Sequence, residues 1–285
     1  MKPEDFRFIH RLRVRWSEVD MQQIVFNAHY AMYLDTAICD YWRHVALPYE
    51  ATMQALNGDI FLKKTTVEFH ASARYDDALA VGLRCARVGR SSMVFEGGVF
   101  LGEQLLTQGE MIYVFANPQT HTSLPVPDPL RHCLEAYERG ESTTQLQCGD
   151  WSHLEHLAGP LRKQVFVQEQ GIDPALEWDA EDAHCVHAVL CNHLGVAVAT
   201  GRLLPSHQGV AEIGRMAVLR RLRETGLGRQ VLLALVAQAQ QRGDSQVLLH
   251  AQRSAQGFYH RLGFVTQGEP FEEAGIVHIA MVLNL

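Results

Sequence analysis

The sequence Arg-Glu-Thr-Gly-Leu-Gly at residues 223–228 decides the fold of the second half of the chain. An apolar run that ends in Met-Ala-Val at 216–218 comes before it, and Val-Leu-Leu-Ala-Leu-Val at 231–236 follows with a helical pattern. This order predicts a strand, a tight turn and a helix. Glycine lets the backbone bend sharply, and the free N–H groups and positive dipole end of a helix favour an anion. We therefore expect the turn to be an anion site that suits a pyrophosphate.

A helix C-cap followed by a surface loop is the other explanation of two close glycines, because so short a motif also occurs by chance. The longer order of strand, Arg-x-x-Gly-x-Gly and helix resembles the acetyl-CoA-binding signature of the GNAT N-acetyltransferases. Segments at 165–170, 198–204 and 248–281 continue this resemblance and fit the ElaA-like branch of that family. The resemblance covers about residues 151–285.

The GNAT resemblance implies a C-terminal α/β acyltransferase domain that uses acetyl-CoA as a co-substrate and holds no permanent cofactor. The pantetheine arm of the donor would lie along the strand before the glycine turn, and an amine would attack the thioester directly. Holding donor and acceptor together is then the main catalytic device. The resemblance assigns Tyr259 as the general acid and the following residues to acetyl-CoA binding: Met216, Ala217, Val218, Arg223, Glu224, Thr225, Gly226, Leu227, Gly228 and Gln252.

Some residues in this half also have structural explanations. Tyr259 could be an aromatic core residue, and Glu212 could be either a catalytic base or a solvated side chain at a strand end. His250 and His278 could belong to the acceptor pocket or be satisfied core histidines. Residues 169–170 lie where the family shapes the acceptor side, or they are surface residues.

The segment at 16–30, Trp-Ser-Glu-Val-Asp-Met-Gln-Gln-Ile-Val-Phe-Asn-Ala-His-Tyr, is the most informative part of the first half. It resembles the signature of hotdog-fold acyl-CoA thioesterases of the 4-hydroxybenzoyl-CoA and YbgC type. In that signature an Asp, a short turn and an apolar run precede an Asn/His-Tyr pair that opens the central helix. Segments at 69–77 and 88–92 support the resemblance, which covers about 8–135.

The hotdog resemblance implies that Asp20 is the catalytic carboxylate, either as nucleophile or as base. Backbone N–H groups near Asn27, at the start of the helix, would hold the thioester oxygen. The resemblance also implies that Arg90, Ser91 and Ser92 contact the CoA tail.

Asp20 could instead be an Asx-turn or helix-capping residue, which is a common role of Asp before a helix. Asn27 could be a turn former, and residues 29–30 could be packing residues. One position departs from the thioesterase pattern, because Gln23 stands where the turn glycine is usual. If this position requires positive φ, Gln is unfavourable there and the geometry of the active site is in question.

The arrangement of patterns predicts two different folds joined end to end. Strand-like runs at 65–71, 78–88, 92–101 and 104–116 surround one helix that begins near Tyr30, which predicts an α+β hotdog domain of antiparallel sheet around a central helix. After it, helices and strands alternate. We expect the hotdog domain at 1–139, a linker without apolar periodicity at 140–150 and the GNAT domain at 151–285.

The composition is that of an ordinary globular protein. Of its 285 residues 47% are hydrophobic and 20% are charged. The net charge of −7 argues against a surface that binds nucleic acid. No apolar run is long enough for a membrane span, and the polar start is unlike a signal peptide. The six cysteines form no Cys-x-x-Cys pair, so we expect a cytoplasmic protein without a metal site.

The sequence therefore predicts a bifunctional enzyme of CoA thioesters. The N-terminal domain would hydrolyse an acyl-CoA, and the C-terminal domain would transfer an acyl or acetyl group to an amine. The alternative is an acyl-CoA-binding or assembly protein in which one domain is catalytically inactive. We also expect a homodimer or a larger homo-oligomer through residues 1–135, because a hotdog sheet leaves a strand edge that must be managed.

Overall fold

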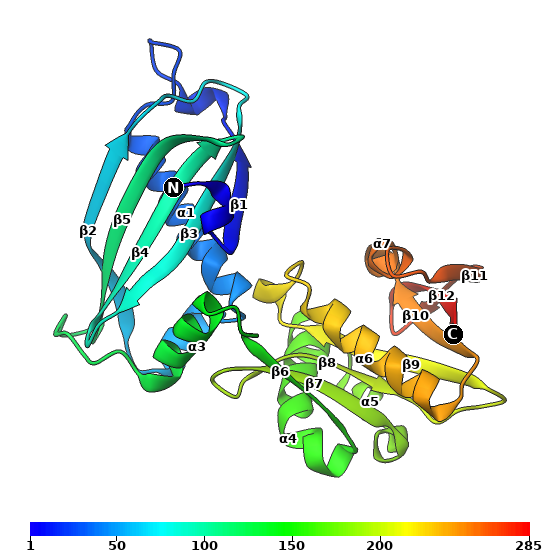
Figure 1. The fold of residues 1–285 in the computed structure, drawn as a ribbon. Coiled ribbons are helices and arrows are strands. Elements are labelled where there is room, and N and C mark those ends of the chain that lie inside the picture. The colour runs from blue at the N-terminus through cyan, green and yellow to red at the C-terminus, as the bar shows by residue number, and fades with distance from the viewer. The chain divides into compact units, whose positions relative to one another are not determined.

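The computed structural model describes residues 1–285, and these divide into two compact units, Met1–Thr143 and Thr144–Leu285. Each unit has its own sheet, with five strands in the first and seven in the second (Figure 1). Helices and strands occur in both units, so the expected α+β class is confirmed. No helix of either unit is long and apolar enough to cross a membrane.

Unit 1 consists of an antiparallel sheet in the strand order β1-β3-β4-β5-β2, with the long helix α1 along one face (Figure 1). The helix buries aromatic and aliphatic side chains on the side that faces the sheet, as its apolar spacing predicts. Its elements are β1 (Phe8–Arg13), α1 (Ala28–His44), α2 (Tyr49–Ala55), β2 (Asp59–Phe69), β3 (Ala78–Val88), β4 (Ser92–Leu101), β5 (Gln104–Ala116) and α3 (Asp128–Glu138).

Helix α1 approaches the sheet closely because two paired glycines leave room for Leu34. Gly97 on β4 lies opposite Gly109 on β5. A Cβ atom added to Gly97 would lie 2.6 Å from Cδ2 of Leu34, and one added to Gly109 would lie 2.5 Å from its Cδ1. Leu34 itself is fully buried. The glycine pair therefore sets the distance between the central helix and the middle of the sheet.

Unit 2 consists of a sheet in the order β11-β12-β10-β9-β8-β7-β6, in which only β9 and β10 are parallel. Its strands are β6 (Thr144–Gly149), β7 (Val186–Asn192), β8 (Ala197–Leu203), β9 (Val210–Val218), β10 (Gln246–Gln252), β11 (Val265–Glu273) and β12 (Ile276–Asn284). Its helices are α4 (Trp151–Arg162), a π-helical turn (Lys163–Glu169), α5 (Pro174–Glu177), α6 (Leu227–Arg242) and α7 (Gln256–His260).

Helices α4 and α6 cover opposite faces of this sheet. Leu154 and Ala158 of α4 pack against Val189 on β7. Gly201 on β8 faces the other side, where a Cβ atom would lie 3.0 Å from Leu235 of α6. The two faces are called the α4 face and the α6 face below.

Two segments differ from the sequence-based expectation. Residues 144–149, expected to be linker, form the edge strand β6 of the second sheet, which pairs only with β7 and buries none of its six side chains. Strand β2 begins at Asp59, six residues before the expected start, and most of it is exposed. In both cases an edge strand carries polar side chains, so alternation of apolar residues does not reveal it.

We predict that Gly109→Ala destabilises unit 1 by about 1–3 kcal/mol, because the new methyl group overlaps Leu34 in a filled core. Calorimetric unfolding of the full chain measures the effect on the transition of unit 1. Leu34→Ala alone should also destabilise the unit, by about 2–5 kcal/mol. The double variant should lose less than the sum of the two, since the methyl group then enters the space that Leu34 vacates. Simple additivity would contradict the proposed contact.

Candidate functional site

The loop between β1 and α1 in unit 1 is anchored by a buried carboxylate that the sequence analysis did not single out. Glu18 is 2% exposed and accepts hydrogen bonds from the backbone N and side chain of Arg15 and from the Tyr33 hydroxyl at 2.9 Å. Burial alone would raise the pKa of Glu18, but the hydrogen bonds from Arg15 and Tyr33 hold that pKa below its usual value. The spacing of Arg15 and Glu18, which form a capping box around a short 3₁₀ helix, was the available sequence signal.

Asp20 lies in the turn that Glu18 anchors. Its Oδ1 accepts the N–H of Gln22 at 2.8 Å, and its carbonyl oxygen accepts the N–H of Gln23 at 2.9 Å. The Asx-turn role of Asp20 is therefore real, while Oδ2 makes no hydrogen bond within the chain. Gln23 has φ of 60°, so the position does adopt the left-handed conformation that favours glycine. A non-glycine residue costs about 1–2 kcal/mol in this region.

The start of α1 presents unpaired donors near Asp20. Asn27 has helical backbone angles and no side-chain cap, and the N–H groups of Asn27 and Ala28 donate no hydrogen bond within the chain. Tyr30 is a packing residue, because its ring is buried and its hydroxyl accepts the N–H of Ala73 at 2.8 Å. Nδ1 of His29 is buried without a hydrogen-bond partner.

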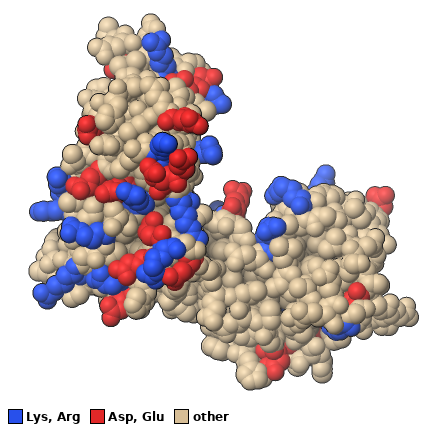
Figure 2. All heavy atoms as spheres, viewed as in Figure 1, with Lys and Arg blue, Asp and Glu red and all other residues tan.

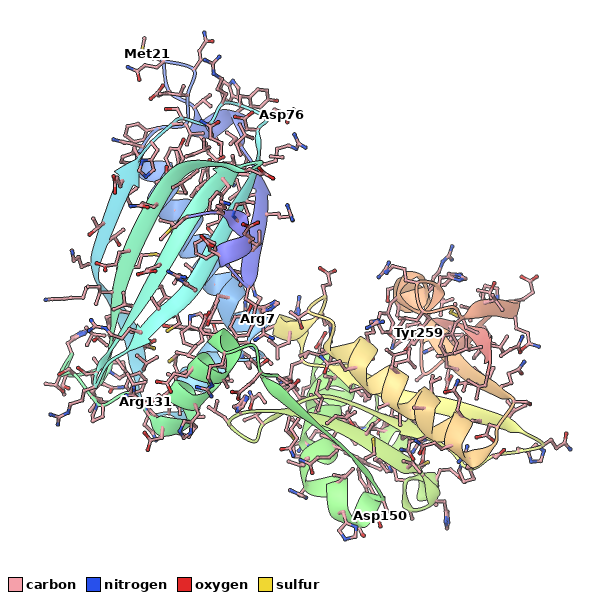
Figure 3. All side chains as sticks on the ribbon, in the orientation of Figure 1. Arg7, Met21, Asp76, Arg131, Asp150 and Tyr259 are labelled. Carbon is pink, nitrogen blue, oxygen red and sulfur yellow. The ribbon has the colours of Figure 1, made fainter.

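Arg90, Ser91 and Ser92 do not lie beside Asp20 in the same chain. They form the turn between β3 and β4, whereas the Asp20 loop packs at the start of β3, where Val14 pairs with Asp77 and Asp76. Strand β3 separates the two ends by about 30–35 Å. Figure 3 shows this separation, with Met21 and Asp76 at one end of the sheet and Arg131, which donates to the carbonyl of Gly89, at the other.

In unit 2, strands β9 and β10 separate beyond their first few residues. They pair in parallel from Val210↔Gln246 to Ile213↔Leu249, and after that point neither strand has a partner on the side of the other. Strand β9 continues to Val218 and β10 to Gln252. The edge of β9 that includes Met216, Ala217 and Val218 therefore offers unpaired backbone groups to an opening between the strands. We call this feature the strand opening.

A backbone bulge at Arg215 lies where the strand opening begins. Arg215 has φ of 51°, and the pairing of β9 with β8 shifts register next to it. Its guanidinium is held by Glu177, with Nε and Oε2 3.0 Å apart, and by Asp179, with Nη2 and Oδ2 3.1 Å apart. These contacts stabilise a conformation that Arg adopts rarely on its own.

The two carboxylates belong to a buried ion network on the α4 face. Arg162 bonds Glu177 and Asp182, and Arg202 bonds Asp179 and Asp182, each at 2.5–2.7 Å. The side chains of Arg162 and Glu177 are 1% and 2% exposed. Burial would raise the pKa of Asp182, but the hydrogen bonds from Arg162 and Arg202 keep that pKa below its usual value. The bulge thus rests on a compensated set of buried charges.

The glycine turn follows the strand opening and begins α6, as predicted. Gly226 has φ of 89°, and a Cβ atom on Gly228 would lie 3.2 Å from Cγ2 of Val218. The N–H groups of Gly226, Leu227 and Gly228 donate no hydrogen bond within the chain, and the first bond of this end runs from Gln230 to Gly226. Glu224 also has positive φ, and the Thr225 hydroxyl donates to the Leu222 carbonyl. Unpaired donors at a helix start form a suitable anion site.

The end of the π-helical turn contacts both the glycine turn and the end of β10. Arg223 forms a two-pronged ion pair with Glu169 at 2.7 and 2.9 Å. The Gln252 amide at the end of β10 donates to Oε1 of Gln170 at 3.1 Å. Residues 169–170 are therefore not independent surface residues, because they contact two of the predicted CoA-binding residues.

Tyr259 lies on α7, which packs close to the glycine turn through Phe258 (Figure 3). Its ring is 8% exposed and makes edge contacts with Phe258 and Phe264. Burial raises the pKa of the Tyr259 phenol to about 12, and the hydroxyl makes no hydrogen bond within the chain. The side chain is thus both a packing residue and a phenol that stays protonated at neutral pH.

Glu212, His250 and His278 share the α4 face of the sheet. Gly214 pairs with Arg202, which faces α4, and alternation along β9 places Glu212 on the same side. Glu212 is at the level of Leu248 on β10, so His250 follows on that face, and the pairing of β10 with β12 adds His278. Arg215 is a packing residue of the bulge. No three His, Cys, Asp or Glu side chains gather in a way that could hold a metal ion.

Family models match both units. Residues 22–108 match the thioesterase superfamily, and residues 167–285 match the acetyltransferase (GNAT) domain. A candidate acetyltransferase of Bacillus subtilis is 38% identical over 130 residues, which are 44% of this chain and 86% of that protein. A UPF0039 protein of Schizosaccharomyces pombe is 36% identical over 127 residues, which are 44% of this chain and 84% of that protein.

Solved structures resemble one unit each. A candidate N-acetyltransferase from Lactobacillus plantarum has a TM-score of 0.48 and 31% identity, and covers 50% of this chain and 99% of its own. A 1,4-dihydroxy-2-naphthoyl-CoA thioesterase from Synechocystis has a TM-score of 0.42 and 16% identity, and covers 45% of this chain and 94% of its own. From the family models and the relatives we conclude that this chain belongs to the GNAT acetyltransferase family through its second unit and carries a hotdog domain of the thioesterase superfamily as its first.

Proposed function

We propose that the chain is a bifunctional enzyme of CoA thioesters, in which unit 1 hydrolyses an acyl-CoA and unit 2 transfers an acetyl or acyl group to an amine. The observation that carries the proposal is the strand opening, which leads directly to a glycine turn with unpaired N–H donors. An extended chain with a diphosphate at one end fits that combination. We further propose that the enzyme acts in the cytoplasm, where a chain with six free cysteines would remain reduced.

In unit 2 the pantetheine arm would lie against the free edge of residues 216–218, and the diphosphate would bind at Gly226, Leu227 and Gly228. The thioester of the donor would then lie toward the end of the strand opening at which β9 and β10 are still paired, near Ile213 and Leu249. Tyr259, whose pKa of about 12 keeps the phenol protonated, supplies a proton to the departing thiolate. Arg223 is available to the diphosphate once it separates from Glu169.

In unit 1 Asp20 would act as nucleophile or base on an acyl-CoA thioester, through the carboxylate oxygen that the turn does not use. The unpaired N–H groups of Asn27 and Ala28 would stabilise the oxyanion. Arg90, Ser91 and Ser92 lie at the far end of β3, so they would serve a CoA molecule bound to the Asp20 of another copy.

This division of the site supports a homodimer or a larger homo-oligomer through unit 1. Strand β2 is an edge of the sheet, and it leaves Leu62 and Phe69 half exposed, at 51% and 50%. Large apolar side chains exposed on an edge strand are usually covered in an assembly. A second copy would cover it and also supply the missing CoA contacts.

A second candidate is an acyl-CoA-binding protein in which unit 1 no longer catalyses. The positive φ of Gln23 favours this candidate, because the side chain imposes strain on the turn that presents Asp20. Free-thiol release from acyl-CoA thioesters separates the two functions, since a binding protein would gain thermal stability with CoA but release no thiol.

Asp20→Asn should abolish thiol release that needs no amine, by about two orders of magnitude or more. The amide keeps an oxygen for the N–H of Gln22, so the turn should survive, while the charge required of a nucleophile or base is lost. A panel of acyl-CoA thioesters without amine measures this activity. Unchanged hydrolysis would assign Asp20 to the turn alone.

Tyr259→Phe tests unit 2 as Asp20→Asn tests unit 1. It should lower amine-dependent thiol release while hydrolysis by unit 1 continues. The ring and its contacts with Phe258 and Phe264 remain, so the KM for acetyl-CoA should change little while kcat falls. Steady-state kinetics with acetyl-CoA and an amine panel distinguishes the two constants. Equal damage to acetyl-CoA binding and to turnover would make Tyr259 a structural aromatic residue.

Gly226→Asp should raise the KM for acetyl-CoA in the transfer reaction, because a carboxylate would stand at the diphosphate site. Gly243→Asp is the control at the other end of α6. Both glycines have left-handed φ, at 89° and 87°, and open space where a Cβ atom would be added. The two variants thus carry similar backbone strain. If Gly243→Asp raises the KM for acetyl-CoA as much as Gly226→Asp does, the effect comes from backbone strain and the anion site is refuted.

A further inference from the structure

His250 stands at the closed end of the strand opening. The last parallel pair joins Leu249 to Ile213, so His250 is the first residue of β10 beyond the pairing, at the level of Gly214 on β9. Its side chain lies on the α4 face and is 37% exposed. If the diphosphate binds at the glycine turn after β9, the thioester end of an extended donor points back toward this level of the strand.

Two side chains of β11 orient the His250 ring, and β12 supports one of them. Nδ1 lies 3.6 Å from Oε2 of Glu273 on β11, and the ring meets the edge of Phe271 with centroids 5.0 Å apart. Phe271 in turn stacks on His278 of β12, whose Nδ1 contacts the carbonyl oxygen of Ile276. Nε2 of His250 makes no hydrogen bond within the chain. The nitrogen that faces away from Glu273 is therefore the one available to a ligand.

The charges around His250 favour a cation beside it. Glu273 on β11, Glu212 on β9 and His278 on β12 share its face. The nearest cation on the α4 face of β9, Arg215, is already paired with Glu177 and Asp179. An ammonium ion that approaches the strand opening from this face meets carboxylates and an imidazole.

We propose that His250 is the general base of acyl transfer in unit 2, with Glu273 as its positioning residue, and that the acceptor is a primary ammonium compound. The inference rests on the proposed transferase function. Nε2 takes a proton from the ammonium group, and the carboxylate of Glu273 stabilises the imidazolium ion that results. The same arrangement aligns the ring so that its free nitrogen faces the acceptor.

Acyl transfer follows once the ammonium group has lost its proton to His250. The neutral amine forms a C–N bond to the thioester carbon, and the C–S bond breaks. The thiolate receives the phenolic proton of Tyr259, and the second proton that the nitrogen loses restores the phenol through solvent. The proton held by His250 then passes to water. One ammonium ion and one acyl-CoA give one amide, one free CoA thiol and one proton.

Glu212 is the competing base on the same face. It lies opposite Leu248, inside the paired part of the two strands, two residues before the strands separate. His250 lies where the pairing ends, next to the free edge that would hold the donor.

His250→Gln tests the assignment in the full chain, with His156→Gln on the exposed surface of α4 as the control. The acceptors are ethanolamine, 1,4-diaminobutane and benzylamine, and thiol release from acetyl-CoA is followed from pH 6 to pH 10. At neutral pH the variant should lose about a hundredfold or more in kcat/KM for the amine, with the KM for acetyl-CoA nearly unchanged. Glu273→Gln should give a smaller loss in the same direction.

The pH profile separates a base from a structural residue. Without the base, transfer depends on amine that is already neutral in solution, so the deficit of His250→Gln should shrink steadily as the pH rises. A constant ratio between wild type and variant across the range, or a variant as active as His156→Gln, would overturn the assignment while the transferase function stands. Absence of transfer to every amine by the wild-type chain would overturn the transferase function and this inference together.

Discussion

The separation of β9 from β10 is the constraint on which the second unit depends. A parallel pair that continued to Val218 would fill the edge that now lies open, and no extended ligand could lie there. The bulge at Arg215, where the backbone enters the left-handed region, coincides with the end of the pairing. That conformation is unfavourable for Arg alone, so its stability derives from Glu177 and Asp179 and, behind them, from Arg162 and Arg202. Local strain at Arg215 is here offset by its direct ion pairs with Glu177 and Asp179, which the two buried arginines hold in place.

In unit 1 the position of the central helix depends on close packing and on one buried carboxylate. The helix lies close to the sheet because Gly97 and Gly109 leave space for Leu34, while Glu18 fixes the loop that leads into that helix. The loop conformation therefore does not depend on the preference of Gln23, which is unfavourable at its position. On the face of this unit that Figure 2 shows, Lys and Arg are interspersed with Asp and Glu.

Sequence patterns predicted those parts of the fold that contain many buried apolar residues. Strands β3, β4 and β5 begin and end at the expected residues, and α1, β9 and α6 lie within a few residues of expectation. Edge strand β6 was missed because its side chains are exposed and polar. The role of Glu18 was missed because a carboxylate in a polar loop gives no sign of burial until its partners are placed. The bulge at Arg215 was equally invisible, since it depends on side chains 36 and 38 residues away in sequence.

The buried ion network and the Arg223–Glu169 pair should respond differently to ionic strength. Arg162, Glu177 and Asp182 are almost fully buried, so added salt would screen the ion pairs between them very little. The Arg223–Glu169 pair is 40% and 25% exposed and is screened far more readily. Salt would thus loosen the π-helical turn from the glycine turn, while the ion pairs of Arg162 with Glu177 and Asp182 persist. The ionic strength of the medium would therefore act mainly on the contact between the π-helical turn and the glycine turn, and little on the buried ion pairs of Arg162.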